Sequence, residues 1–151
     1  MTAPARDTAG TRSLERVIHV AEFRAGLRRF LSRSERVARR RGLTPQRYLL
    51  LLMIKGAADG SERATLTELA ERLQLSPNTV TELCARAEKA GLISRHAAPH
   101  DARVAYLRVT AEGDRRLTAA IEEIEADRKE LSRALADLAA SLRSVPRRPG
   151  R

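Results

Sequence analysis

Residues 65–110 read TLTELAERLQLSPNTVTELCARAEKAGLISRHAAPHDARVAYLRVT, and this stretch decides the fold. Its first part places four apolar side chains at the i, i+3, i+4 and i+7 spacing of one helix face: Leu66, Leu69, Ala70 and Leu73. Thr65 precedes this face and Glu68 follows three residues later. That spacing is typical of a capping box, in which each side chain accepts from the backbone N–H of the other residue. The pattern predicts a short amphipathic helix.

A second helix is predicted directly after a turn at residues 74–75. Ser76 is a suitable N-cap, because its hydroxyl accepts from a free amide of the first helical turn. Pro77 follows at the first helical position, where its missing N–H costs nothing. The helix is expected to reach about Ala90 and to end at Gly91, a residue typical of the position just past a helix. Two short helices therefore meet across a tight turn.

The two sides of this second helix differ in chemistry. One side is apolar and is expected to pack on the first helix: Val80, Leu83, Cys84 and Ala87. The other side is polar or basic: Asn78, Thr79, Glu82, Arg86 and Lys89, with Thr81 flanking. Helices that read DNA present such side chains to base edges, where Asn pairs with adenine and Arg with guanine. The alternative is an ordinary amphipathic surface helix, since helix-turn-helix pairs also occur in proteins that never touch DNA.

Two strands around a polar loop are predicted next. Residues 92–96 form the first strand and residues 104–109 its antiparallel partner, in which alternate residues share a face. The loop between them, residues 97–103, contains Asp101 and Arg103, and this carboxylate could hold the guanidinium in one pose. A preset Arg suits the strong negative potential of a narrow minor groove. The alternative is an exposed ion pair worth roughly 0–1 kcal/mol. Together the elements predict a winged helix-turn-helix.

These residues resemble the multiple-antibiotic-resistance regulator (MarR) family. Residues 101–113, DARVAYLRVTAEG, are similar to the wing signature of that family, with Val109-Thr110 where Leu-Thr is usual. Residues 79–81 and 88–93 resemble its recognition helix and the exit from it. The resemblance extends in layout over about residues 13–143 and is specific over 66–113. It implies that Arg103 reads the minor groove with Asp101 as its orienting partner. It also implies a major-groove set: Ser76, Asn78, Thr79, Thr81, Glu82 and Arg86, to which Lys89 is added.

Length and charge agree with a DNA partner. The 151 residues suit one domain, and 29 Lys+Arg against 19 Asp+Glu give a net charge of +10, almost all of it from Arg. This excess favours a polyanion, and Arg suits bidentate contacts to phosphate and guanine. No long apolar run marks a membrane span, and residues 1–12 lack the apolar region of a signal peptide. A single Cys excludes an intrachain disulfide, so we expect a cytoplasmic protein on the nucleoid.

The predicted fold class is mostly α with a small β-wing. Residues 1–12 and 144–151 are expected to be disordered tails, the second of them basic, around one domain at 13–143. Its winged lobe spans about 44–110, and long dimerisation helices span about 13–41 and 111–143. Within the lobe, Thr44 caps a helix from Pro45 to about Lys55 that is apolar nearly all round and should be buried.

A heptad seam on the last helix predicts a homodimer. Its members are spaced alternately four and three apart, with one polar interruption: Leu117, Ile121, Ile124, Arg128, Leu131, Leu135, Leu138 and Leu142. With Val20 and Phe23 of the long first helix, this seam is expected to bury itself against a second copy. The alternative is packing of the last helix on the first within one chain. A two-fold dimer would place two wings on half-sites of a palindrome about 34–36 Å apart.

The resemblance implies a pocket for a small aromatic or anionic effector between the dimer helices and the lobe. The residues expected there are His19, Phe23, Phe30, Arg47, Tyr48 and Leu51. The alternative is that these side chains fill the core. Some relatives sense oxidants through a thiol near the start of the first helix, where this chain has none. Cys84 lies instead on the inner face of the second helix and is expected to act as a small hydrophobe.

Enzymatic readings find no support. His96 and His100 are four apart, but on the wing, where that spacing has no facial meaning, and no Cys/His cluster has zinc spacing. No Gly-rich phosphate loop or GxSxG elbow occurs, so no catalysis, metal or cofactor is expected. We expect a dimeric, sequence-specific transcriptional regulator, a repressor released by an effector. The alternative is an effector-independent nucleoid-associated or protein-interaction module. Glu82 favours the first, because a carboxylate facing DNA makes sense mainly for specific reading.

Overall fold

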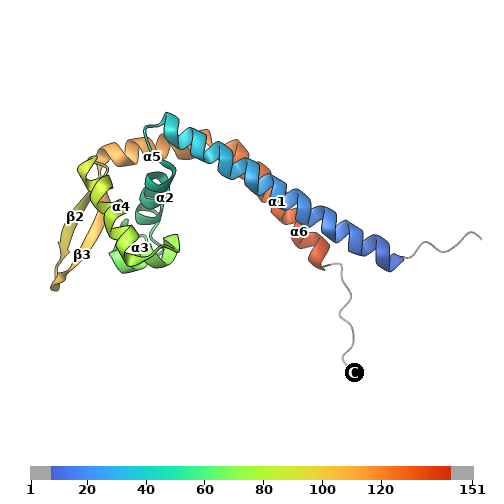
Figure 1. Cartoon of the computed structure of the whole chain (residues 1–151), viewed down its shortest axis with the longest axis horizontal. Coiled ribbons are helices and arrows are strands. Elements are labelled where there is room, and N and C mark those ends of the chain that lie inside the picture. Colours follow the sequence, from blue (N-terminus) through green and yellow to red (C-terminus); the bar gives the residue numbers. More distant parts are fainter. Residues whose placement is uncertain (1–7, 144–151) are drawn as a thin grey trace, which may run out of the picture. The chain divides into compact units, whose positions relative to one another are not determined.

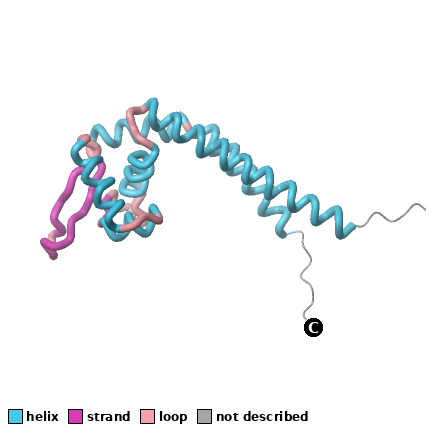
Figure 2. The backbone as a smooth tube through the Cα atoms, in the orientation of Figure 1, coloured by secondary structure: helices cyan, strands magenta, loops and turns pink. Residues whose placement is uncertain are grey.

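A computed structural model describes residues 8–143, so the predicted tails at 1–7 and 144–151 lie outside the described residues. The elements, in order, are α1 (Thr8–Arg40), α2 (Pro45–Lys55), β1 (Arg63–Ala64), α3 (Leu66–Leu73), α4 (Pro77–Lys89), β2 (Ile93–Ala98), β3 (Asp101–Val109), α5 (Ala111–Glu123) and α6 (Glu125–Arg143) (Figure 1). Figure 2 shows that helix dominates and that strand is confined to one small sheet. The predicted fold class, mostly α with a β-wing, is confirmed.

The chain forms two compact units. One, here called the lobe, is residues 34–123, and the other, here called the arm, is residues 8–33 with 124–143. The core of the lobe draws one or more fully buried side chains from most of its elements: Leu50, Leu51, Ile54, Leu69, Val80, Leu92, Leu107 and Leu117. Helix α2 spans the predicted residues and contributes three of these, so the expected burial holds for its inner side. Leu49 is 43% exposed, so one side of α2 is open.

Local signals set the α3–turn–α4 geometry as predicted. The capping box is present, since Glu68 accepts from the Thr65 backbone N–H at 2.7 Å and Thr65 Oγ1 accepts from the Glu68 N–H at 3.3 Å. Gln74 then takes a left-handed conformation, with φ of 55°, which turns the chain between the helices. Ser76 caps α4, and its hydroxyl accepts from Thr79 N at 3.2 Å. These caps fix how the two helices meet.

The sheet differs from the prediction in two ways. Strand β1 is an unpredicted third member, and the strand order is β1-β3-β2 with antiparallel pairing throughout. The loop predicted at 97–103 is much shorter, because β2 reaches Ala98 and β3 begins at Asp101, with a register shift between Ala97 and Ala98. Both faces of this part of the wing meet water, so the apolar alternation that marks a half-buried strand fades while the backbone pairing continues.

Two helix boundaries also correct the sequence predictions. Helix α1 begins at Thr8, so residues 8–12 are helical and not part of a disordered tail. The single helix expected over 111–143 is two helices, which meet at Ile124, a residue with no exposed surface. A heptad pattern indicates which side chains share a face and does not show whether the helix is continuous. The pattern therefore spans the break without revealing it.

Within the arm, the first part of α1 lies along α6. Arg33 Nε contacts Asp127 Oδ2 at 3.0 Å, and Gly26 lies against Ala134 and Leu131. The arm leaves large apolar side chains exposed, by 44% to 60%: Leu14, Val17, Ile18, Val20, Leu31, Leu135 and Leu142. Among the residues predicted for dimerisation, Val20 and Leu135 thus remain available. Leu117 and Ile124 are already buried within the single chain, at 1% and 0% exposure.

Candidate nucleic-acid interface

Helix α4 has the two predicted faces. Its apolar residues pack inward with at most 4% of their surface exposed: Val80, Leu83, Cys84 and Ala87. Its polar residues are all exposed: Asn78, Thr79, Thr81, Glu82, Arg86 and Lys89. The sequence period alone therefore placed the chemistry of this helix correctly, and the exposed side offers donors, acceptors and positive charge together.

Some of these polar groups already form contacts within the helix. Ser76 Oγ lies 2.8 Å from Thr79 Oγ1, and Thr81 Oγ1 donates to the carbonyl oxygen of Pro77 at 2.9 Å. Glu82 Oε2 lies 3.6 Å from Arg86 Nη2, which confirms that this carboxylate is placed to orient the guanidinium. The Asn78 amide has no intramolecular hydrogen bond in the described part of the chain. The Asn78 amide therefore remains available for an outside partner, and the Arg86 guanidinium lies beside a carboxylate.

The tip of the wing carries one strongly projecting guanidinium. Arg103 has 95% of its side chain exposed, and its Nε lies 3.8 Å from Asp101 Oδ1. The same Asp101 oxygen accepts from the backbone N–H of Arg103 at 3.0 Å. The predicted pairing is confirmed, and its main anchor is the backbone amide. Since an exposed ion pair contributes little stability, the arrangement leaves the guanidinium in solvent with its starting direction restrained.

A junction of backbone hydrogen bonds holds the wing against α4. These hydrogen bonds were not predicted from the sequence. Leu92 N donates to the Ala87 carbonyl at 3.0 Å, and the Leu92 carbonyl accepts from Thr110 N at 3.0 Å. Thr110 Oγ1 donates to the Gly91 carbonyl at 2.6 Å and accepts from Gly113 N at 3.1 Å. A Cβ at Gly113 would come closer than 3.0 Å to the carbonyl oxygen of Leu92. Thr110 and Gly113 of the wing signature therefore join β3 to α5. Only glycine fits at residue 113.

The residues predicted to bind an effector are divided between the units. His19 and Phe23 belong to the arm, and the Nδ1 atom of His19 is buried without a hydrogen-bond partner. Tyr48 and Leu51 are core side chains of the lobe, 6% and 0% exposed, while Arg47 donates its backbone N–H to the Thr44 hydroxyl at 3.2 Å. Their role in ligand binding stays a prediction.

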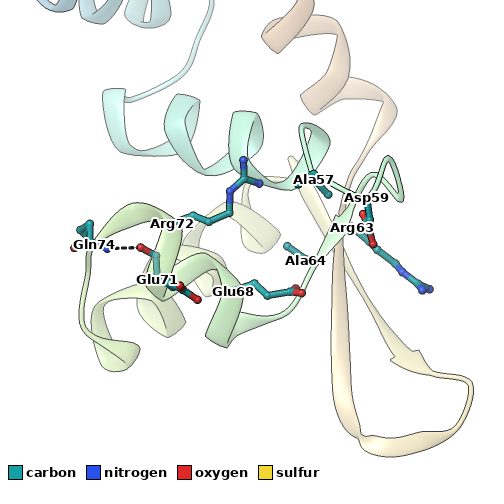
Figure 3. Close-up of a pocket in the computed structure, with 9 residues that line it drawn as sticks. Ala57, Asp59, Arg63, Ala64, Glu68, Glu71, Arg72 and Gln74 are labelled. Carbon is teal, nitrogen blue, oxygen red and sulfur yellow. Dashed lines mark hydrogen bonds between the residues drawn. The ribbon is translucent and has the colours of Figure 1, made fainter.

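A surface pocket of about 520 Å³ lies elsewhere on the lobe, beside α3 (Figure 3). Its lining includes none of the residues predicted for an effector: Ala57, Ala58, Asp59, Arg63, Ala64, Glu68, Glu71, Arg72 and Gln74. Arg72 donates to the carbonyls of Met53 and Gly56 at 2.6 and 3.2 Å, which caps the end of α2. Glu68 is held in the capping box. Arg72 and Glu68 of the pocket are thus already engaged in contacts that stabilise the fold.

Cys84 has the surroundings of a structural thiol. Its side chain is buried, and this burial raises the pKa of the thiol to about 11. Because the thiolate is the reactive form, a neutral buried thiol is poorly suited to sensing oxidants. Over residues 8–143, no group of three or more His, Cys, Asp or Glu side chains is arranged to hold a metal ion. No helix in this range is long and apolar enough to cross a membrane.

Comparison with known proteins finds a family similar to the middle of this chain. Residues 41–104 match a family model described as MarR family. The transcriptional repressor MdtR of Bacillus subtilis is 36% identical over 90 residues, which are 60% of this chain. Residues 41–104 are thus similar to the MarR family. The matched stretch is 53% of MdtR, so this chain spans about half the length of that curated relative.

Solved structures extend the likeness to the fold as a whole. The transcriptional regulator Tm0710 of Thermotoga maritima is 26% identical, with a TM-score of 0.58, over 74% of this chain and 76% of its own. A mutant of MarR from E. coli, solved with operator DNA, is 21% identical, with a TM-score of 0.58, over 78% of this chain and 85% of its own. The second likeness shows the fold alone. The MarR family is a family of transcriptional regulators, as MdtR exemplifies.

The junction at Gly113 yields a stability prediction. Gly113→Ala should lower the free energy of unfolding by about 1–3 kcal/mol, because the added methyl meets a backbone carbonyl that cannot rotate away. Gly26→Ala is the matched control, since its Cβ would meet other atoms only at 3.8–3.9 Å within a helix. That change should stabilise by about 0.5–1 kcal/mol. Urea unfolding followed by circular dichroism measures both, and equal effects at the two positions would contradict the role of the junction.

Proposed function

We propose that this chain is a MarR-family member and a dimeric, sequence-specific DNA-binding transcriptional repressor of the cytoplasm, acting on the nucleoid. The exposed face of α4 carries the proposal, because it combines a free amide at Asn78 with a carboxylate-oriented guanidinium at Arg86. The projecting Arg103 of the wing supports it. MdtR is named a transcriptional repressor and the E. coli MarR structure contains operator DNA, and both names agree with the function proposed.

The composition of the α4 face favours reading of sequence over binding by charge alone. A surface that binds any DNA needs only cations, whereas this face includes Glu82 beside Arg86. A carboxylate repels phosphate, so its presence is favourable only if it accepts from a cytosine amino group or directs the guanidinium toward a base. The net charge of +10 then supplies the attraction common to all sequences.

Dimerisation is supported by the apolar surface of the arm. Seven large apolar side chains of α1 and α6 are at least 44% exposed in the single chain. Exposed apolar side chains gathered on one part of a molecule are typical of surfaces that bind another protein. A second copy is the simplest occupant, because a two-fold axis would place two α4 helices on half-sites one helical turn, about 34–36 Å, apart.

Selection of bound duplexes from a random DNA pool at near-physiological salt tests this function directly. We expect enrichment of a palindrome whose half-sites are about one helical turn apart, which would show both specificity and a dimer. If the pool is not enriched while binding depends strongly on salt, the alternative of a nucleoid-associated or protein-interaction module replaces the repressor.

Substitutions on α4 and the wing should then separate base reading from phosphate contact. Asn78→Ala or Arg86→Ala should cost roughly 1–3 kcal/mol at one base pair of each half-site and relax specificity there. Arg103→Ala should weaken binding at AT-rich flanks and lower the salt slope by about one unit per protomer. Fluorescence anisotropy with the selected operator and single-base variants measures these effects. Equal losses on every sequence for Arg86→Ala would show that it contacts only phosphate.

Release from DNA by a small aromatic or anionic effector completes the proposal. Among the residues expected to contact it, the unpartnered Nδ1 of His19 is a polar atom that such a ligand could satisfy. An effector must bind differently to DNA-competent and DNA-incompetent forms. We therefore expect a panel of aromatic carboxylates and phenols to include one that raises the operator Kd for the wild type but not for His19→Ala. An operator Kd that no compound changes would argue against an effector of this class.

A further inference from the structure

The outer face of the small sheet carries a cluster that the α4 and wing-tip contacts do not use. Strand alternation sends Ala64, Ile93 and Leu107 inward, where each is at most 3% exposed. The intervening residues lie on the opposite, outer face and form what is here called the basic sheet face: Arg63, Ser94, His96, Tyr106 and Arg108. All of them are exposed or half-buried.

Two arginines of the basic sheet face stand directly opposite each other. Arg63 of β1 and Arg108 of β3 are Cα partners in the antiparallel pairing. Like charges in this relation destabilise a sheet unless something neutralises them. In the described part of the chain, neither guanidinium forms an ion pair with a carboxylate. Arg63 lies over the Tyr106 ring, and Arg108 Nη1 donates to the Ser61 carbonyl at 3.3 Å.

Several other arginines of the lobe have a carboxylate partner. Arg95 and Arg86 have a carboxylate partner within 4 Å, and Arg115 and Arg116 share Glu112. Asp59 is the acidic residue beside Arg63 in Figure 3, but its Oδ1 accepts from the Ser61 backbone N–H at 2.9 Å. Hydrogen bonds from Ser61 lower the pKa of Asp59, and the charge of Arg63 contributes to this lowering. The basic sheet face nevertheless holds two guanidinium groups without an ion-paired carboxylate, and an anion from outside is the complement it fits.

The stacking contact prepares this face for phosphate. The guanidinium carbon of Arg63 is 4.0 Å from the centroid of the Tyr106 ring, so the flat group is held against the aromatic surface. A guanidinium held by its face keeps its N–H edge available, and that edge matches the paired oxygens of a phosphate. Figure 3 shows the Arg63 side chain, which also lines the pocket, directed away from α3. His96 adds a further polar edge, with its Nε2 2.8 Å from Ser94 Oγ.

We propose that the basic sheet face binds the phosphate backbone of duplex DNA that flanks the operator, and so lengthens the footprint of each protomer. The inference rests on the proposed function, because the wing that carries this face also carries Arg103. Contacts to phosphate position a protein without reading bases. The face therefore adds affinity and salt dependence outside the recognised half-site and leaves sequence preference to α4 and Arg103.

The experiment compares two duplexes, the selected operator alone and the same operator between arms of unrelated sequence. Wild-type protein should bind the longer duplex more tightly and with a steeper dependence on salt. Arg63→Gln with Arg108→Gln should remove that gain, with the slope of log K against log salt falling by about 2 units per protomer, one for each lost phosphate contact. Affinity for the operator alone should change less than twofold.

Two matched variants separate the site from its charge and from folding. Arg39→Gln with Arg133→Gln removes the same charge from exposed helical positions and should keep the gain from the longer duplex. Arg63→Lys with Arg108→Lys restores the charge and should recover most of the salt slope. Thermal unfolding of each variant should match the wild type within a few degrees.

The possible failures are distinguishable. If the wild type selects an operator but gains nothing from the arms, the proposed contact is wrong and the repressor stands. The same holds if the glutamine variant loses as much affinity on the short duplex as on the long one. If the control variant with Arg39→Gln and Arg133→Gln loses as much of the gain from the longer duplex, the gain comes from overall charge. That result would also overturn the proposed contact. A protein that selects no operator overturns the repressor and this inference together.

Discussion

The geometry between α4 and the wing depends on the backbone of one buried residue, Leu92. Its N–H donates to Ala87 near the end of α4, and its carbonyl accepts from Thr110 at the end of β3. One peptide segment therefore ties the recognition helix to the wing, and Gly113 lets α5 begin directly against it. Because hydrogen bonds at buried positions are costly to leave unmade, α4 and the base of the wing should move as one piece. The spacing between Arg86 and the wing is thus set by backbone and not by side chains.

How far the sequence predicted this structure depended on the range of the signals. The boundaries of α2, α3 and α4 were predicted closely, because caps such as Thr65 and Ser76 act within one helical turn of the residues they fix. Strand β1 was missed because two residues carry no detectable period, and it exists only through pairing with β3, more than 40 residues later. The break at Ile124 was missed because heptad spacing records which face a residue occupies and not helix continuity.

The same distinction between local signals and contacts of distant residues applies to the candidate interface. The exposed side of α4 follows from helical period, and the Asp101–Arg103 pair follows from a separation of two residues, so both were predicted. The engagement of Thr81 with the Pro77 carbonyl was not, since a hydroxyl on the outer face can turn either to the helix or to DNA. The opposed pair Arg63 and Arg108 is non-local, and only strand register reveals it.

The distribution of carboxylates explains where the positive charge of the lobe is available. Glu112 is shared by Arg115 and Arg116, and their hydrogen bonds lower its pKa to about 2. Glu123 is likewise held by Arg40 and Arg41, which lower its pKa below the usual range. These acids neutralise arginines that join α5 to its neighbours. On the wing, by contrast, the single acid near Arg103 mainly accepts from a backbone amide, and the outer sheet face has none in ion-pair contact. The electrostatic footprint is therefore set by where the acids are placed, which net charge alone does not indicate.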